Sequence, residues 1–162
     1  MKRRDFLGLA AVCGLMSALP QQGLSQAPVL TVVDELSGKT RHYTDDDLMA
    51  LQQESFVTET IWTEGKDTFS GPSLLTVLQD AGIQNAKLRI SAVNDYSVTV
   101  PASQLKDKWP ILANRINGKP FPVRQKGPLW LMFPFDSEPA LRTETNYTLC
   151  VWQLNKIAAI AE

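Results

Sequence analysis

Turn-forming residues divide this chain into short segments, and this division limits the folds open to it. Ten prolines and nine glycines are spread over the 162 residues, with clusters at residues 70–73 and at Gly127-Pro128. Such residues interrupt helices and strands, so a long helix has little room between them. The intervening apolar runs are short and rich in β-branched and aromatic residues, which is typical of strands. The sequence therefore predicts a single, β-rich α+β domain with two or three short helices.

The expected helices are short. One is predicted at residues 45–53, since Thr44 suits an N-cap and the aspartates after it suit the positive end of the helix dipole. A metal cluster at residues 45–47 is the alternative, and the capped helix is the simpler explanation. Further helices are predicted from Leu74 to Gly82 and at residues 104–108. Strands are predicted at residues 29–33, 40–43, 55–62, 88–93, 96–100, 129–133 and 147–154, with residues 157–160 closing the chain.

The net charge and the few histidines and cysteines argue against a nucleic-acid-binding protein and against a structural zinc site. The net charge of −1 argues against a strongly basic nucleic-acid binder, so no nucleic-acid partner is expected. One histidine and two cysteines are too few for a structural zinc site. His42 is expected on the surface, with a catalytic base as the alternative. Cys150 is expected to be a small buried residue, with a reactive thiol as the alternative.

The first 27 residues are expected to form a cleavable export signal. Basic residues precede a weakly apolar stretch at residues 7–19, and small residues stand near Ala27. The run Arg3-Arg4-Asp5-Phe6-Leu7 resembles a twin-arginine signal, which directs folded proteins across the inner membrane. We therefore expect a periplasmic protein whose domain comprises residues 28–162.

Aromatic residues beside polar ones mark a candidate binding site. Trp62 follows Thr60, Tyr96 follows Asn94-Asp95, and Trp130 precedes Asp136. Stacking faces next to amide and carboxylate groups suit a flat, hydrogen-bonding heterocycle. The alternative is that the tryptophans fill the core, and this interpretation is preferred for Trp109 and Trp152.

Several segments, taken together, resemble the molybdopterin-binding domain of the sulfite oxidase family. The resemblance covers residues 56–157, and its order and spacing are more specific than any one motif. It implies the fold of that domain. The segments are Phe56-Val57-Thr58-Glu59-Thr60-Ile61-Trp62, Phe69-Ser70-Gly71, Leu74-Leu75, Ala81-Gly82, Asn94-Asp95-Tyr96, Leu112-Ala113, Asn117-Gly118-Lys119-Pro120 and Lys126-Gly127-Pro128-Leu129-Trp130 with Pro134.

One departure from that family bears on cofactor and activity. The family binds molybdenum through a cysteine thiolate, and Thr58 stands at the matching position. A neutral hydroxyl does not replace a soft thiolate, so molybdenum is not expected. A small exported version without this cysteine resembles the PruR-type periplasmic pterin-binding regulators. That resemblance implies a reduced pterin as ligand, and as partner the periplasmic region of a membrane diguanylate cyclase or phosphodiesterase. A molybdopterin-dependent oxidoreductase, or a subunit of one, is the alternative, and a partner-binding module with an empty pocket is a third.

The resemblance also implies a set of site residues, none of them catalytic and none a metal ligand. Asp95 or Asp136 is expected to accept hydrogen bonds from the amino group and ring N–H of the pterin, while the aromatic residues stack on its ring. Arg124 and Arg142, like Arg115, either meet a hydroxyl or phosphate or stay solvated. The expected ligand-binding residues are Thr60, Trp62, Asn94, Asp95, Tyr96, Arg115, Trp130 and Asp136.

Overall fold

The computed structural model describes residues 26–84 and 86–161. The expected export signal therefore lies almost entirely outside the described residues. Within them, no helix is long and apolar enough to cross a membrane.

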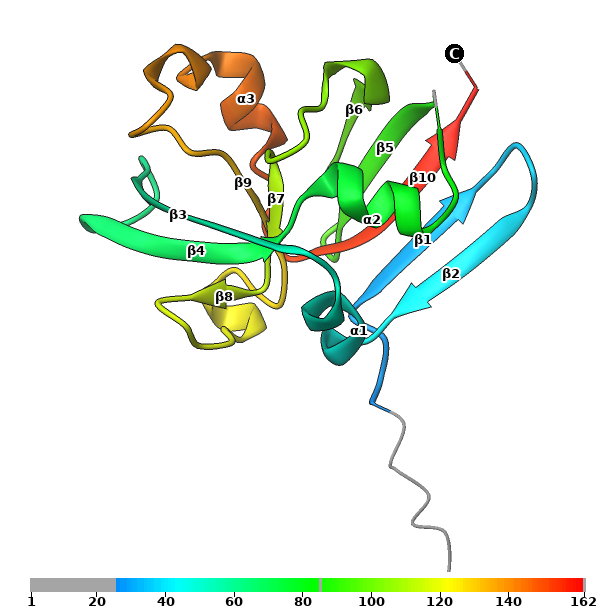
Figure 1. Cartoon of the computed structure of the whole chain (residues 1–162), viewed down its shortest axis with the longest axis horizontal. Helices are drawn as coiled ribbons and strands as arrows, with labels where there is room; N and C mark the ends of the chain where they lie inside the picture. The colour runs from blue at the N-terminus through cyan, green and yellow to red at the C-terminus, as the bar shows by residue number, and fades with distance from the viewer. Residues whose placement is uncertain (1–25, 85, 162) are drawn as a thin grey trace, which may run out of the picture.

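The largest sheet has five strands in the order β2-β1-β10-β5-β6 (Figure 1). Its strands β1 and β10 run parallel, and the other neighbouring pairs are antiparallel. The parallel pair brings the first and last strands of the described chain together in the middle of the sheet. The strands are β1 (Leu30–Asp34), β2 (Lys39–Tyr43), β5 (Lys87–Ala92), β6 (Ser97–Pro101) and β10 (Leu154–Ile160).

Two smaller sheets lie beside the large one. One has the order β3-β4-β8 and the other pairs β7 with β9. Their strands are β3 (Gln53–Glu59), β4 (Lys66–Pro72), β8 (Arg115–Ile116), β7 (Ile111–Ala113) and β9 (Trp130–Met132). The helices are α1 (Asp45–Ala50), α2 (Leu74–Asp80) and α3 (Glu144–Leu149), with 3-10 turns at Ala102–Gln104, Val123–Gln125 and Pro139–Leu141. The predicted β-rich α+β class with short helices is confirmed.

The start of α1 explains the run of aspartates. The Thr44 hydroxyl accepts a hydrogen bond from the backbone N–H of Asp47 at 3.1 Å, and the Asp47 carboxylate accepts from the N–H of Thr44 at 2.8 Å. This reciprocal capping box satisfies two N–H groups that a helix start leaves free. The helix begins at Asp45, as predicted, but ends at Ala50 rather than at residue 53.

The prediction of a strand at residues 147–154 is wrong. Its first residues belong to α3, and the strand β10 begins only at Leu154. Thr143 caps α3, because its hydroxyl accepts from the backbone N–H of Asn146 at 3.2 Å. The aromatic and β-branched residues in this stretch favour a strand, but the N-cap at Thr143 outweighs this local preference and a helix forms.

Two other boundaries also differ from prediction. No strand is predicted from the sequence between residues 62 and 74, yet β4 begins at Lys66 and pairs along its whole length with β3. Pairing with a neighbouring strand outweighs the low strand propensity of these residues. The helix predicted at residues 104–108 is instead the short 3-10 turn Ala102–Gln104.

Two surface and core predictions are confirmed. His42 is exposed on β2, with its Nδ1 3.2 Å from the Thr31 hydroxyl. Cys150 is buried, and its thiol donates a hydrogen bond to the Asn146 carbonyl at 3.3 Å. Burial raises the pKa of this thiol, so it stays protonated at neutral pH.

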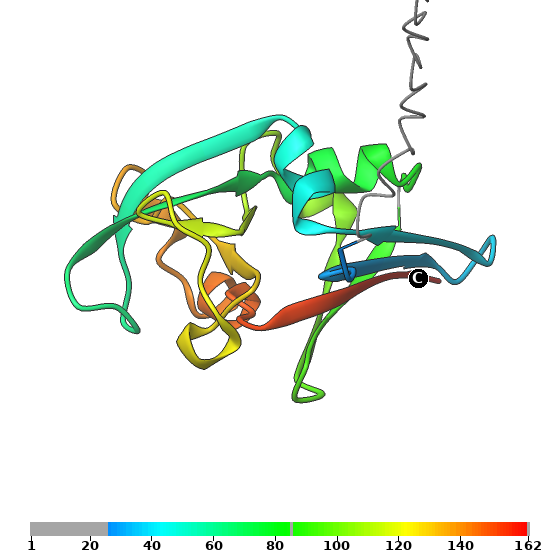
Figure 2. The same cartoon turned by 90° about the horizontal axis from the view of Figure 1, so that it is seen from below.

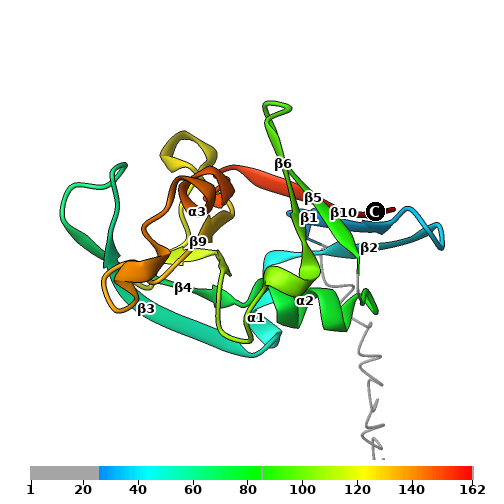
Figure 3. The same cartoon turned by 90° about the horizontal axis from the view of Figure 1, so that it is seen from above.

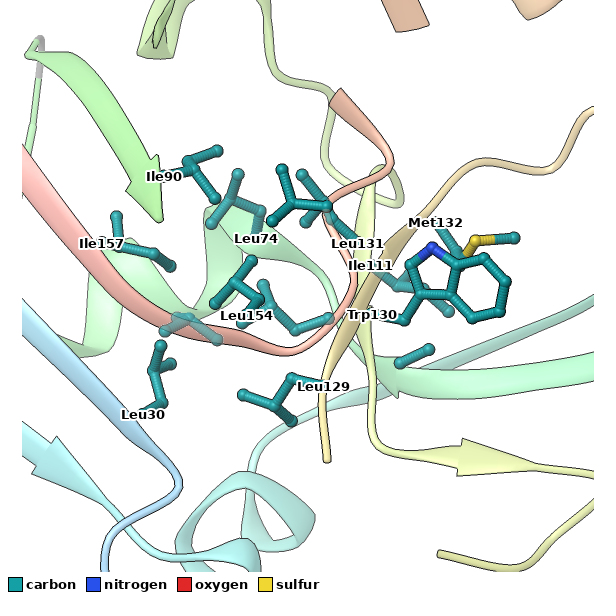
Figure 4. Close-up of a cluster of buried hydrophobic side chains, with 14 of the residues drawn as sticks. Leu30, Leu74, Ile90, Ile111, Leu129, Trp130, Leu131, Met132, Leu154 and Ile157 are labelled. Carbon is teal, nitrogen blue, oxygen red and sulfur yellow. The ribbon is translucent and has the colours of Figure 1, made fainter. Parts of the chain in front are cut away.

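The core runs from the large sheet to the β7–β9 pair (Figure 4). Leu30, Ile90 and Ile157 cluster at the sheet, and Trp130 and Met132 stand at the other end. Strands β4 and β7 approach closely at Gly71, where a Cβ would lie 2.0 Å from the Leu112 carbonyl oxygen. Only glycine fits at this crossing, which brings the smaller sheets together.

The turn between β5 and β6 projects beyond the large sheet (Figures 2 and 3). Helix α3 lies toward the same end of the molecule, whereas α1 and α2 lie toward the opposite end. The projecting turn and α3 together bound the hollow described next.

Candidate ligand-binding site

A cavity of about 530 Å³ lies between α3, the β5–β6 turn and the segment after β3. Its volume is in the range that holds small organic ligands. Most of its lining is apolar or aromatic, with a few polar groups, which is the usual composition of such sites. The lining residues are Trp62, Ala92, Asn94, Tyr96, Glu144, Tyr147, Thr148, Cys150, Val151 and Trp152.

Aromatic rings form one wall of the cavity. The ring of Trp62 meets Tyr147 at a centroid distance of 5.9 Å and Trp152 at 5.7 Å, both nearly edge to face. Such pairs hold the rings in fixed orientations. The wall therefore presents rigid flat surfaces on which a planar ligand can stack.

Trp130 lies behind this wall. It is 2% exposed, and its ring packs edge-on against Trp152 at 6.3 Å and tilted against Trp62 at 6.2 Å. Its indole N–H donates to the carbonyl of Cys150 at 3.2 Å. Trp130 therefore supports the aromatic wall and does not line the cavity.

Thr60 fixes the backbone of the aromatic wall. It is buried, and its hydroxyl accepts a hydrogen bond from the backbone N–H of Trp62 at 3.1 Å. Its own N–H donates to the hydroxyl of Thr63 at 3.0 Å. Hydroxyl groups that bond to nearby N–H groups in this way stabilise tight turns. Thr60 thus positions Trp62 without lining the cavity.

The β5–β6 turn provides the polar rim. The Asn94 side-chain oxygen accepts from the backbone N–H of Tyr96 at 3.3 Å, and the Tyr96 hydroxyl donates to the Thr148 carbonyl on α3 at 3.1 Å. This last hydrogen bond ties the turn to α3 across the cavity. Asp95 lies between them at a φ of 64°, a conformation that aspartate tolerates better than most residues. Asp95 is exposed and does not line the cavity.

Asp136 belongs to a separate ion-pair cluster. Its carboxylate lies 3.0 Å from Lys66 Nζ and 2.6 Å from Arg142, and it accepts from the N–H of Glu59 at 3.4 Å. The hydrogen bond from Lys66 is the main cause that lowers the pKa of Asp136. Asp136 also accepts from the hydroxyl of Thr58 at 3.5 Å. These partners occupy its oxygens outside the cavity.

Arg115 is engaged elsewhere as well. Its guanidinium pairs with Asp45 through hydrogen bonds of 2.6 and 2.9 Å, and Asn114 donates to the same carboxylate at 3.0 Å. The hydrogen bond from Arg115 is the main cause that lowers the pKa of Asp45. Arg124 lies exposed in a 3-10 turn and does not line the cavity.

The structure therefore brings together only part of the expected site. Trp62, Asn94 and Tyr96 line the cavity. The sequence pattern does not indicate the contribution of α3 and the segment after it, because it predicts a strand at residues 147–154. The cap sequence Thr143-Glu144 is the signal that could have revealed it. The lining residues that were not expected include Glu144, Tyr147, Thr148 and Trp152.

The described residues offer no obvious set of metal ligands. Among residues 26–84 and 86–161, no group of three or more His, Cys, Asp or Glu side chains converges in a way that could hold a metal ion. Thr58 is fully buried at the end of β3 and does not line the cavity. The donor set around Thr58 does not fit a thiolate-bound metal.

No protein-family model matches this chain, and no curated protein matches its sequence. A functional assignment therefore depends on the residues and geometry described above.

Proposed function

We propose that this protein binds a reduced pterin, without molybdenum, in the cavity formed by the β5–β6 turn and α3. The observation that carries the proposal is the aromatic wall of Trp62, Tyr147 and Trp152 facing a rim of polar groups. A pterin is a flat bicyclic ring with hydrogen-bond donors and acceptors on its edge. Stacking on an aromatic side chain is worth about 1–3 kcal/mol for a base of similar size.

The polar rim supplies partners for the edge of the ring. The side-chain oxygen of Asn94 keeps a free lone pair, and the carboxylate of Glu144 accepts hydrogen bonds. These acceptors suit the amino group and ring N–H of a pterin. They take the role that the family resemblance implies for Asp95 and Asp136.

The proposal includes no molybdenum, because Thr58 offers only a buried hydroxyl at the position where the resembled family has its ligand. That hydroxyl is directed to the Glu59 carbonyl and the Asp136 carboxylate, at 3.4 and 3.5 Å. We assign no redox step and no catalytic residue to the chain.

We further propose that the loaded protein signals from the periplasm to the periplasmic region of a membrane diguanylate cyclase or phosphodiesterase. The β5–β6 turn supports this role, since it combines contact with the cavity and exposure to solvent. Tyr96 lines the cavity and is 45% exposed, and Val93 in the same turn is 55% exposed. A ligand in the cavity would therefore lie next to a surface that a partner can contact.

Anaerobic titration with tetrahydrobiopterin, followed by tryptophan fluorescence, tests the ligand proposal. Binding should be saturable, and Trp62→Ala should weaken it by about tenfold or more because a stacking surface is lost. Trp109→Ala is the matched control, since Trp109 lies outside the cavity lining and should leave affinity unchanged. No binding by the wild-type protein, or equal loss in both variants, would contradict the proposal.

A further inference from the structure

A second hollow adjoins the aromatic cavity. It has a volume of about 430 Å³ and lies between β6 and α3. Glu144 and Thr148 line both hollows and therefore form the ridge between them. They are four residues apart on α3, so they lie on the same face of the helix, and the Thr148 hydroxyl donates to the backbone carbonyl of Glu144 at 2.9 Å. The residues lining the second hollow are Val98, Thr99, Val100, Gln104, Glu144, Thr145, Thr148 and Leu149.

The two hollows differ in chemistry. Aromatic rings dominate the first, whereas hydroxyl and amide groups from Thr99, Gln104 and Thr145 contribute to the second. Hydroxyls and amides both donate and accept hydrogen bonds, so they suit uncharged polar groups such as alcohols.

Glu144 sets the charge of the whole site. Among the described residues that line either hollow, it is the only charged one. It takes part in none of the ion pairs formed by the described residues. A phosphate in either hollow would face this carboxylate with no lysine or arginine from the lining to offset the repulsion. Phosphate sites in proteins normally supply such groups.

We infer that the ligand has an uncharged polar substituent that crosses the ridge into the second hollow, and that Glu144 excludes phosphorylated ligands. This inference rests on the proposed function, because it assumes that the ring of the ligand occupies the aromatic cavity. Glu144 is then a specificity-determining residue. Its charge would allow the protein to bind simple hydroxylated pterins and to reject cofactors that carry a phosphate group.

Two probes of the same ring test the inference. Dihydroneopterin has an uncharged, hydroxylated side chain, and its monophosphate ester adds only the phosphate. Isothermal titration with wild-type protein should show a preference of about tenfold or more for the uncharged probe, as expected for like charges a few ångströms apart in a partly solvated site. Glu144→Gln keeps the size and helix preference of the side chain and should reduce this preference to about threefold or less.

Glu138→Gln is the matched control. Glu138 is also exposed and lies at the start of the nearby 3-10 turn, but it lines neither hollow. This variant should keep the preference of the wild-type protein. Circular dichroism of both variants verifies that each is folded.

The results that would overturn the inference differ from those that would overturn the proposed function. Equal binding of the two probes by the wild-type protein, or a preference for the phosphate ester, would overturn the inference while leaving pterin binding intact. A preference that survives Glu144→Gln would remove the role of Glu144. Absence of binding for both probes would overturn the proposed function together with the inference.

Discussion

Replacing Trp130 by phenylalanine separates a supporting role from a ligand-contacting one. The indole of Trp130 is buried behind Trp62 and Trp152, and its N–H donates to the carbonyl of Cys150 at 3.2 Å. Phenylalanine keeps an aromatic ring but removes this donor. If Trp130 only supports the cavity wall, the variant should lose stability while affinity for a pterin changes little.

The magnitude follows from the lost contacts. A buried carbonyl left without its hydrogen bond costs about 1–3 kcal/mol. The smaller ring leaves a partial void among Phe69, Trp62 and Trp152, which adds about 1 kcal/mol. The sum of about 2–4 kcal/mol is a large part of the stability of an ordinary domain.

Urea denaturation and pterin titration measure the two effects on the same samples. With an m-value of about 2 kcal/mol/M, the unfolding midpoint of Trp130→Phe should fall by about 1–2 M. Its affinity for tetrahydrobiopterin in the absence of urea should stay within about threefold of wild type, in contrast to Trp62→Ala. An unchanged midpoint with a large loss of affinity would refute the reasoning, because it would place Trp130 in contact with the ligand.

Two further predictions concern the fold. Gly71→Ala forces a Cβ against the carbonyl of Leu112, so it should lower the melting temperature by roughly 5–10 °C, and a melting curve that matches wild type would contradict the close approach. A hydrogen bond from Lys66 is the main cause that lowers the pKa of Asp136 in the folded protein. The ion pairs of Asp136 therefore stabilise the folded state fully at a pH above the ordinary carboxyl pKa of about 4. This stabilisation is lost progressively as the pH falls through the lower pKa of the folded state. Asp136→Asn should therefore be less stable than wild type at about pH 7, with a difference that narrows below about pH 4 in urea titrations; a difference independent of pH would contradict this assignment.

Local sequence signals predicted much of the large sheet. The short runs of β-branched residues at β1 and β5 form strands as expected, and the turn at Asn94-Asp95 joins β5 to β6. The cap at Thr44 also marked the start of α1. These strands, this turn and this helix start are determined by residues close together in the sequence, so the local pattern is sufficient to predict them.

The features that were missed depend on distant partners. Strand β4 exists because its polar residues pair with β3, and no local pattern marks it. Helix α3 follows from a cap that competes with strongly β-forming neighbours at Tyr147 and Val151. A pattern of apolar and polar residues does not resolve such a competition.

The candidate site was only partly predictable for the same reason. Trp62 and Tyr96 could be recognised as aromatic residues beside polar ones. These two residues line one cavity with Trp152 only in the folded chain, and no spacing in the sequence encodes that arrangement. Trp152 was expected to serve only the core, yet it packs on the core and lines the cavity at once.

Native mass spectrometry of the protein, purified anaerobically from expressing cells, tests the central claim most directly. We expect an added mass equal to that of a simple, unphosphorylated pterin and no accompanying metal. A mass that corresponds to molybdopterin with molybdenum would contradict it and would favour an oxidoreductase. A bare chain that also fails to take up added tetrahydrobiopterin would contradict it in favour of a partner-binding module.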